Sequence, residues 1–291
     1  MRPVLLAAMI GVLSAGAPAG ALAQGRPVSE LRVTPDTTMV EEVTLRDGTT
    51  LIGRIVRIGE GGVTVRTLGG LEVMVQPDDI IGVRPVHGSV RFGEFWEEDP
   101  SDSRLFVGPT ARVPRAGRGY FGVYELFIAS GAVGLGGQAM LAGGVSLIPG
   151  LDLDEQVFYL APKVQVVNLP SVQAAAGLFW VKPGTSEGSA GLVFGSVTGG
   201  SRDAALSVGL AYPFASQGGF SDEPLVMLGG ELRADRRIKL VSENWIVPGD
   251  DAIVLSFGFR IIAKNLTVEA GAVTVTDGGG VLPIVNFSAA W

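Results

Sequence analysis

The chain has 291 residues and a formal net charge of −7; 47% of its residues are hydrophobic, 18% are charged, 43 are glycine and none is cysteine. The lack of cysteine excludes a disulfide framework, thiol catalysis and cysteine metal sites, and an acidic chain without a clustered basic face is not expected to bind nucleic acid. A mean hydropathy of +0.38 with so much glycine disfavours helices, because each interior glycine costs a helix about 1 kcal/mol. The composition favours a sheet with lipid against one face.

The first 23 residues have the order of a secretory signal peptide. Arg2 precedes an apolar run from Val4 to Leu13, and small residues follow as far as the motif Ala21-Leu22-Ala23. The apolar run is shorter than the about 20 residues that a transmembrane helix needs. We therefore predict that residues 1–23 are removed by cleavage after Ala23 and that residues 24–38 form a flexible lead-in.

Residues 39–86 are predicted to form a small β-domain. Five short segments with alternating or continuous apolar residues are separated by turn sequences. These turns are Asp47-Gly48, Glu60-Gly61-Gly62, Gly69-Gly70 and Pro77-Asp78-Asp79. Five short strands in a segment of this length are typical of a small barrel of the SH3-like or Sm-like kind.

A short motif in this domain resembles the first motif of Sm-like folds. The residues that carry the resemblance are Val43, Leu45, Asp47, Gly48 and Gly53. The resemblance implies the fold and no activity. RNA binding is rejected, because between Met39 and Val86 seven acidic residues stand against five arginines. The partner that we expect for this domain is a periplasmic protein.

Residues 87–118 are predicted to link the small domain to a larger one. Phe92, Phe95 and Trp96 lie beside several acidic residues in this segment. Aromatic side chains cover apolar surface, so docking on the small domain is favoured over a position at the membrane surface.

From residue 119 to residue 291 the chain alternates between apolar and small or polar residues, in segments of about the 9–11 residues that a transmembrane β-strand needs. In one such segment Phe257 and Phe259 alternate with Gly258 and Arg260. The candidate strands are 119–128, 138–148, 156–167, 172–182, 189–198, 203–213, 224–234, 238–247, 252–262, 266–276 and 280–291. Bacterial barrels have an even number of strands, so two candidates merge or Leu105 to Val107 extends into a twelfth strand.

The predicted fold is therefore all-β: an antiparallel transmembrane β-barrel of 10–12 strands, preceded by a small five-stranded β-barrel domain. A β-sandwich also alternates, which leaves a soluble exported β-sandwich binding protein as the weaker alternative. Gly209, Gly258 and Gly271 fall on the inner face and predict a narrow interior.

A run of motifs resembles a family of uncharacterised bacterial outer-membrane β-barrel proteins over residues ~99–291. The motifs are Asp99-Pro100, Ser103-Arg104-Leu105-Phe106, Gly108-Pro109-Thr110, Gly119-Tyr120-Phe121 and the stretch from Gly143 to Gly150. The last strand, which ends at Trp291 with Phe287 and Val285 on one face, resembles the assembly signal of such barrels. The resemblance implies the bacterial outer membrane, its lipid and the barrel assembly machinery as partners, and it implies no activity.

Six charged residues fall on strand faces that we assign to the lumen. They are Glu125, Lys163, Glu231, Arg233, Arg260 and Glu269. A Lys or Arg on the lipid face would cost about 2–4 kcal/mol at the midplane, so we expect an internal salt-bridge network. No catalytic, metal or cofactor site is predicted, because His87 is the only histidine and lies outside the predicted barrel.

Two main functions follow. The first is a structural role, in which a plugged barrel anchors the 39–86 domain in the periplasm. The alternative is a narrow porin-like passage for small solutes, with Lys163, Arg233 and Arg260 tuning its selectivity. An enzyme at the extracellular rim is a weaker possibility, and we expect that the protein is not an enzyme.

Overall fold

The computed structural model describes residues 31–34, 40–91, 94–247, 252–276, 278 and 280–291. The predicted signal peptide and most of the predicted lead-in lie outside these residues. The chain divides into two compact units, one ending at Glu98 and the other beginning at Asp99. Each unit is described by itself. In the described part of the chain, no helix is long and apolar enough to span a membrane.

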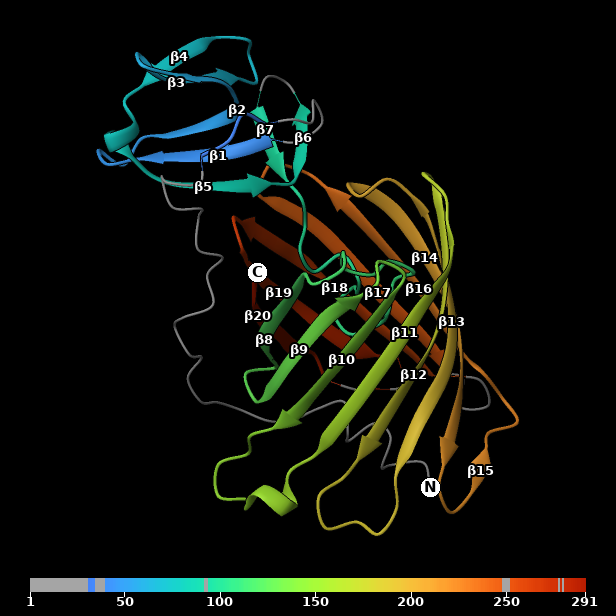
Figure 1. Ribbon diagram of the computed structural model, residues 1–291. Helices are drawn as coiled ribbons and strands as arrows, with labels where there is room; N and C mark the ends of the chain where they lie inside the picture. Colours follow the sequence, from blue (N-terminus) through green and yellow to red (C-terminus); the bar gives the residue numbers. More distant parts are fainter. Residues whose placement is uncertain (1–30, 35–39, 92–93, 248–251, 277, 279) are drawn as a thin grey trace. The chain divides into compact units, whose positions relative to one another are not determined.

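The N-terminal unit contains a five-stranded antiparallel sheet (Figure 1). The strands are β1 (Val40–Leu45), β2 (Thr50–Gly59), β3 (Gly62–Thr67), β4 (Glu72–Val75) and β5 (Ile80–Val86). Their order in the sheet is β4-β3-β2-β1-β5. The sheet has its own apolar core, built around Val43, Val63 and Val65. All five predicted strands are present, whereas the closure of this sheet into an Sm-like barrel stays a prediction.

Gly53 lies where two strands of this sheet approach closely. A Cβ atom at Gly53 would lie 2.2 Å from the carbonyl oxygen of Arg66 on β3, so only glycine fits without moving the backbone. The irregularity in the pairing of β2 with β3 lies further along, between Ile55 and Arg57. Gly53 therefore marks a close approach of β2 to β3 and not a bulge.

The predicted linker 87–118 does not exist as one segment. Its first part forms a two-stranded hairpin of β6 (Gly88–Arg91) and β7 (Glu94–Glu97), which belongs to the N-terminal unit. Phe92, which the docking prediction used, lies outside the described residues. The second part, residues 99–118, belongs to the barrel unit, because its side chains find their partners inside the barrel.

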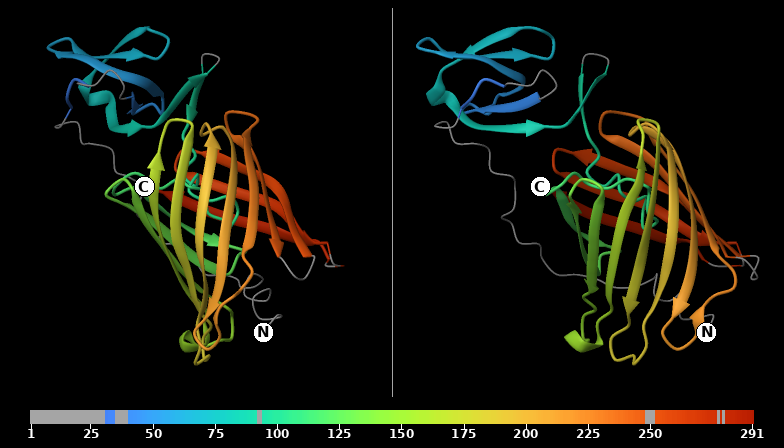
Figure 2. Two further views of the ribbon diagram at one scale, coloured as in Figure 1. Left: turned by 90° about the vertical axis from the view of Figure 1, so that its right-hand side faces the viewer. Right: turned by 45° about the vertical axis from the view of Figure 1, so that its right-hand side comes forward.

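The second unit is a closed antiparallel barrel of twelve strands (Figures 1 and 2). They are β8 (Gly119–Tyr124), β9 (Ile128–Leu135), β10 (Ala139–Ser146), β11 (Phe158–Asn168), β12 (Val172–Lys182), β13 (Ala190–Gly200), β14 (Ala204–Ala215), β16 (Leu225–Arg233), β17 (Ile238–Val247), β18 (Ala252–Ala263), β19 (Leu266–Val275) and β20 (Leu282–Ala290). Each strand pairs with the next, the short β15 (Gly219–Phe220) folds back on β14, and β20 pairs with β8. This closure excludes the β-sandwich alternative and confirms the predicted fold class.

The twelfth strand is not the one that the sequence suggested. Leu105 to Val107 forms no strand. The additional strand is β9 (Ile128–Leu135), inside the uncharged stretch from Leu126 to Leu151, which contains seven glycines. Its alternation is weak because small residues such as Ala132 and Gly134 face inward where other strands carry polar groups. The predicted ranges 172–182 and 238–247 coincide with β12 and β17.

The alternating side chains separate cleanly between the two faces of the barrel wall. On β14, Leu206 is 72% exposed and Leu210 is 50% exposed on the outer surface, whereas Ala205 and Ser207 are buried. Successive side chains of a strand point to opposite faces, so the apolar set covers the outside. An apolar outer belt is what lipid requires of a barrel.

Replacement of Leu210 by arginine is expected to destabilise the folded barrel by about 2–4 kcal/mol, because it places a charge near the middle of the lipid-facing surface. The free energy of unfolding in urea, measured in lipid vesicles, tests this. The control is Leu71→Arg, since Leu71 is 66% exposed in the N-terminal unit and should tolerate arginine. Equal effects of the two substitutions would contradict the lipid-facing position of Leu210.

The connections at the two ends of the barrel differ in length. Those at one end, named the short-turn end, are residues 136–138, 169–171, 201–203, 234–237 and 264–265. Those at the other, named the long-loop end, include residues 125–127, 147–157, 183–189 and 216–224. The loop 147–157 contains the 3-10 helix η3 (Leu153–Glu155), whose first turn is capped through the side chains of Asp152 and Glu155.

Candidate functional site

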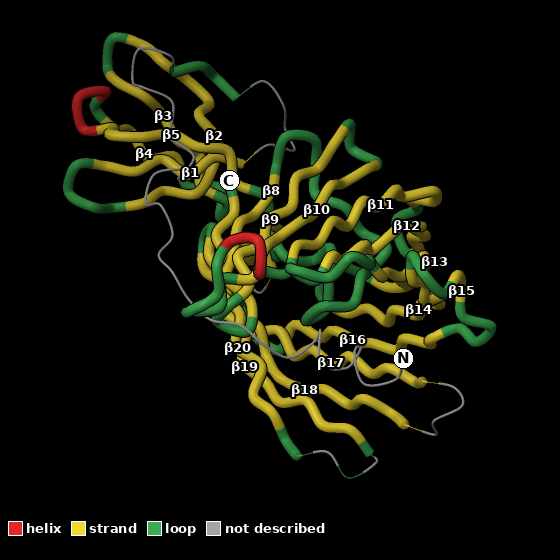
Figure 3. Tube along the Cα trace, turned by 90° about the horizontal axis from the view of Figure 1, so that it is seen from below, coloured by secondary structure: helices red, strands yellow, loops and turns green. Residues whose placement is uncertain are grey.

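Residues 99–118, named the plug, lie inside the barrel (Figures 1 and 3). Leu105 and Phe106 belong to no strand, yet they are almost fully buried and pack in one cluster with Met227, Val241 and Trp245 of the wall. The plug turns back on itself at this point. The backbone N–H of Leu105 donates to the carbonyl of Gly108 at 2.9 Å. A loop stabilised in this way enters and leaves the lumen at the short-turn end, which contains Gly119 at the start of β8.

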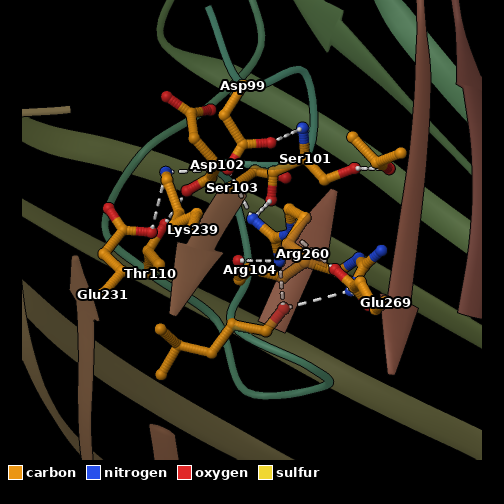
Figure 4. A network of polar contacts seen from close by, with 12 residues as sticks. Asp99, Ser101, Asp102, Ser103, Arg104, Thr110, Glu231, Lys239, Arg260 and Glu269 are labelled. Carbon is orange, nitrogen blue, oxygen red and sulfur yellow. Dashed lines mark hydrogen bonds and ion pairs between the residues drawn. The ribbon is translucent and has the colours of Figure 1, made fainter. Parts of the chain in front are cut away.

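Buried ion pairs attach the first part of the plug to the wall (Figure 4). The carboxylate of Asp99 lies 2.6 Å from the Arg260 guanidinium and 2.7 Å from Lys239 Nζ. Arg260 also reaches Glu269 at 2.6 Å, and Arg104 of the plug reaches Glu269 at 2.8 Å. All five side chains are almost inaccessible to solvent, so each charge depends on its neighbours for compensation.

Asp99 remains ionised in this arrangement. Burial alone would raise the pKa of the Asp99 carboxyl, but the positive charges of Arg260 and Lys239 outweigh burial and hold the pKa well below its ordinary value. A depressed pKa means that the contribution of Asp99 to stability is present above the ordinary pKa of an aspartate and is lost only as the pH falls. The plug therefore keeps this attachment at neutral and mildly acidic pH.

The second part of the plug is attached to other strands. Arg112 pairs with Glu231 of β16. Lys163 of β11 donates to the carbonyl of Ser103 at 2.7 Å and to that of Thr110 at 2.8 Å. Asp102 pairs at 2.5 Å with Arg202, which lies in the turn between β13 and β14. The plug thus contacts strands on several sides of the lumen.

Glu243 of β17 binds the tip of the plug through backbone groups. The N–H groups of Phe106, Val107 and Gly108 donate to Glu243 Oε2 at 2.8, 2.9 and 2.9 Å. Trp245 Nε1 donates to the other carboxylate oxygen at 2.8 Å. A Cβ atom on Gly108 would lie 2.5 Å from Met227 Sδ. Successive N–H groups that converge on a carboxylate form an anion-binding nest, here occupied by a side chain of the barrel.

The structure places five of the six predicted lumen charges inside the barrel. Lys163, Glu231, Arg260 and Glu269 contact the plug or each other through the pairs above, and Arg233 pairs with Asp203 at 3.7 Å. The sixth differs from expectation. Glu125 lies in the turn between β8 and β9 with a φ of 49°, because its predicted strand 119–128 ends at Tyr124.

Several residues of the site were absent from the sequence-based set. They are Asp99, Asp102, Arg104, Arg112, Arg202, Lys239 and Glu243. Four of these belong to the plug, which has no strand periodicity and was interpreted as linker. One signal was available: the adjacent apolar residues Leu105 and Phe106, because such side chains are most often buried.

Glu125 has a pH-dependent role at the long-loop end. Burial raises the pKa of the Glu125 carboxyl to about 7 from the ordinary 4.5; a backbone hydrogen bond with Val285 opposes the shift, and the negative charge of Glu269 adds to it. A raised pKa means that the contribution of Glu125 to stability is complete at low pH and is lost as the pH rises through about 7.

The expected result is that the free energy of unfolding of the wild type falls between about pH 5 and about pH 8, and that Glu125→Gln removes this part of the dependence. Urea unfolding at both pH values measures it. The matched control is Glu187→Gln, which changes an exposed carboxyl at the same end of the barrel. An unchanged pH dependence in Glu125→Gln would contradict the assignment.

The lone histidine takes no part in this site. His87 follows β5 in the N-terminal unit, and its carbonyl accepts from the N–H of Glu98 at 2.9 Å. Among the residues that the structure describes, no three Asp, Glu or His side chains lie close enough to hold a metal ion.

A closed antiparallel barrel with an apolar outer face and a polar interior is the architecture of the transmembrane β-barrels of bacterial outer membranes. No protein-family model and no curated protein sequence matches the chain.

Three solved structures, two of them of porins, are similar to it. One is a KdgM porin in complex with disordered oligogalacturonate (TM-score 0.43, 7% identity, 60% of this chain and 95% of that chain). Another is the NanC porin, with a TM-score of 0.39 and 8% identity over 60% of this chain and 97% of that chain. A third is the Acinetobacter baumannii outer membrane protein Omp33, with a TM-score of 0.35 and 10% identity over 60% of this chain and 95% of that chain. The likeness is distant, and the closure of the barrel stands on its own strand pairing.

Proposed function

We propose that this protein is a porin-like passage of the bacterial outer membrane for small solutes, which the plug holds closed in the conformation described. The apolar outer face and the strand lengths fit a lipid bilayer. The polar and charged inner face fits a water-filled path. Short turns face the periplasm in bacterial barrels, which would place the short-turn end, and the entry of the plug, on the periplasmic side.

The observation that carries the proposal is the polarity of the contacts between plug and wall. Apart from the apolar clusters of Leu105 and Phe106 and of Val113, the contacts described between plug and wall are ion pairs and hydrogen bonds. A buried ion pair adds little net stability, because the cost of desolvating its charges offsets their attraction. Water and ions can replace such contacts when the plug leaves.

The wall does not depend on the plug for its own backbone pairing. Every strand of the barrel is hydrogen-bonded to two neighbouring strands, and β20 pairs with β8 over the register from Asn286–Tyr124 to Ala290–Tyr120. A barrel whose backbone groups are satisfied within the ring is stable in lipid. Departure of the plug would therefore open the lumen without breaking the ring.

Conductance in planar bilayers tests this proposal, with the wild type compared side by side with a variant whose plug is loosened. Low, infrequent current from the wild type and sustained current from the loosened variant would support it. No current from either protein, with both barrels shown to be folded by a change of gel mobility on boiling, would overturn it.

A second candidate function is anchoring of the N-terminal unit. The observation that favours it is chain continuity: the N-terminal unit ends at Glu98, and the next residue, Asp99, is fixed inside the barrel by Arg260 and Lys239. A tether secured at its first residue would hold a periplasmic domain at the membrane. Anchoring predicts that the N-terminal unit stays with the membrane fraction only while residue 99 onward is present.

A further inference from the structure

A pocket of about 480 Å³ lies where the plug leaves the wall at the short-turn end. Six polar side chains line it, three of them arginines: Arg112, Arg115, Gln165, Asn168, Gln173 and Arg202. Neither aspartate nor glutamate is among its lining residues. The side chain of Arg202 is 47% exposed, so the pocket communicates with solvent.

The electrostatics of this pocket favour a negative ligand. Glu231 and Asp102, which pair with Arg112 and Arg202, are not among the lining residues, so the charged groups that face the pocket are arginines. A recessed site with an excess of one charge concentrates ions of the opposite sign.

The pocket also contains a buried acceptor. Gln173 Nε2 donates to the carbonyl of Leu169 at 2.6 Å, but Gln173 Oε1 is buried and has no hydrogen-bond partner among the described residues. An unpartnered buried polar atom costs free energy, and a donor from a bound molecule would remove that cost. Arginine forks match carboxylate and phosphate groups. A ligand that satisfies both features carries an acidic group and a hydroxyl.

The pocket exists only while the plug is in place. Arg112 and Arg115 come from the plug, whereas Gln165, Gln173 and Arg202 come from the wall and its turns. When the plug leaves, the two halves separate and the site is lost. A ligand that binds one state of a protein stabilises that state. The sign of the effect is therefore fixed: occupancy favours the plugged barrel.

We propose that this pocket binds a small hydroxylated organic anion that acts as an effector, and that its occupancy holds the plug in the barrel. The effect on passage rests on the proposed function, whereas the binding itself does not. The ligand of this pocket is distinct from any solute that crosses the lumen, since a crossing solute requires the plug to leave and the effector requires it to stay.

Isothermal titration of the full-length protein in detergent with gluconate tests the binding, and uncharged sorbitol is the control ligand. The informative variant is Gln173→Glu, which keeps the shape of the side chain but places a negative charge in the pocket. It is expected to weaken gluconate binding by about tenfold or more. The matched control is Gln217→Glu, the same change in an exposed loop at the long-loop end, and it should bind gluconate like the wild type.

A second variant distinguishes loss of the binding site from loss of folding. Arg115 is exposed, so Arg115→Gln should leave the barrel folded, as judged by gel mobility before and after boiling, and should also weaken gluconate binding. Absence of binding to the wild type, equal binding of sorbitol, or binding unchanged in both pocket variants would overturn the site.

Conductance separates this proposal from the proposed function. Gluconate is expected to lower the frequency of openings in the wild type and to have no effect on a barrel with a loosened plug. A rise in openings with gluconate would overturn the effector role. If the protein binds gluconate but never conducts, the result supports the anion site and contradicts the passage function.

Discussion

Sustained ion current is the expected result when Arg104, Leu105, Phe106 and Arg112 are all replaced by serine. Leu105 and Phe106 provide the apolar contacts of the plug with Met227, Val241 and Trp245. Arg104 and Arg112 provide its ion pairs with Glu269 and Glu231. Serine keeps the chain length and removes these four attachments. The polar contacts that remain, made by Asp99, Asp102 and the plug backbone, are ones that water can replace. The plug should then leave the lumen for most of the time.

The twelve-stranded wall of the barrel should stay folded after these substitutions. Glu269 keeps Arg260 as a partner at 2.6 Å, and Glu231 keeps Lys239 at 3.3 Å. Both wall carboxylates that lose an arginine of the plug therefore keep a positive neighbour, and Glu243 keeps the hydrogen bond from Trp245 Nε1, so the strands have no reason to rearrange. An unchanged shift of gel mobility on boiling would show that the ring is intact.

The matched control replaces two arginines and two large apolar residues on the surface of the N-terminal unit with serine: Arg57, Ile58, Arg66 and Leu71. This control should conduct no more than the wild type. A loosened plug that gives no current in a folded barrel would mean that the lumen is closed by the wall itself. Current from both variants would mean that the plug is not the barrier.

Arg260→Met is expected to destabilise the barrel by about 3 kcal/mol, the lower part of the range for removing one partner from a buried ion pair. Arg260 is fully buried and contacts both Asp99 and Glu269. The cost stays in the lower part of the range because Lys239 still compensates Asp99 and Arg104 still compensates Glu269. Urea unfolding in lipid vesicles measures this free energy.

Two further variants make the Arg260 result specific. The double variant Arg260→Met/Glu269→Gln also removes the negative charge that Arg260 compensates, so it should be less destabilised than the sum of the single variants. Arg236→Met, at an exposed turn position, should change the stability little. A double variant that equals the sum of its parts would show that Arg260 acts through packing and not through Glu269.

The inner and outer faces of many barrel strands could be predicted from the local sequence pattern. Alternation with a period of two separates inner from outer residues, and it correctly divided β14 into an exposed set with Leu206 and a buried set with Ala205. The same alternation indicated that Lys163, Glu231, Arg233, Arg260 and Glu269 face the lumen. Where the alternation was weak it failed: β9 was missed because Ala132 and Gly134 are too small to mark an inner face.

The plug could not be found in this way. The pair that secures it, Asp99 with Arg260, joins residues 161 positions apart, and Arg104 with Glu269 joins residues 165 apart. No period in the sequence relates such residues, since they meet only after the barrel has closed. The sequence by itself determined the barrel strands other than β9 and, where the alternation is clear, which face of a strand points outward. Only the tertiary structure decided what fills the lumen, because the partners of the inner charges lie on other strands and on a segment without periodicity.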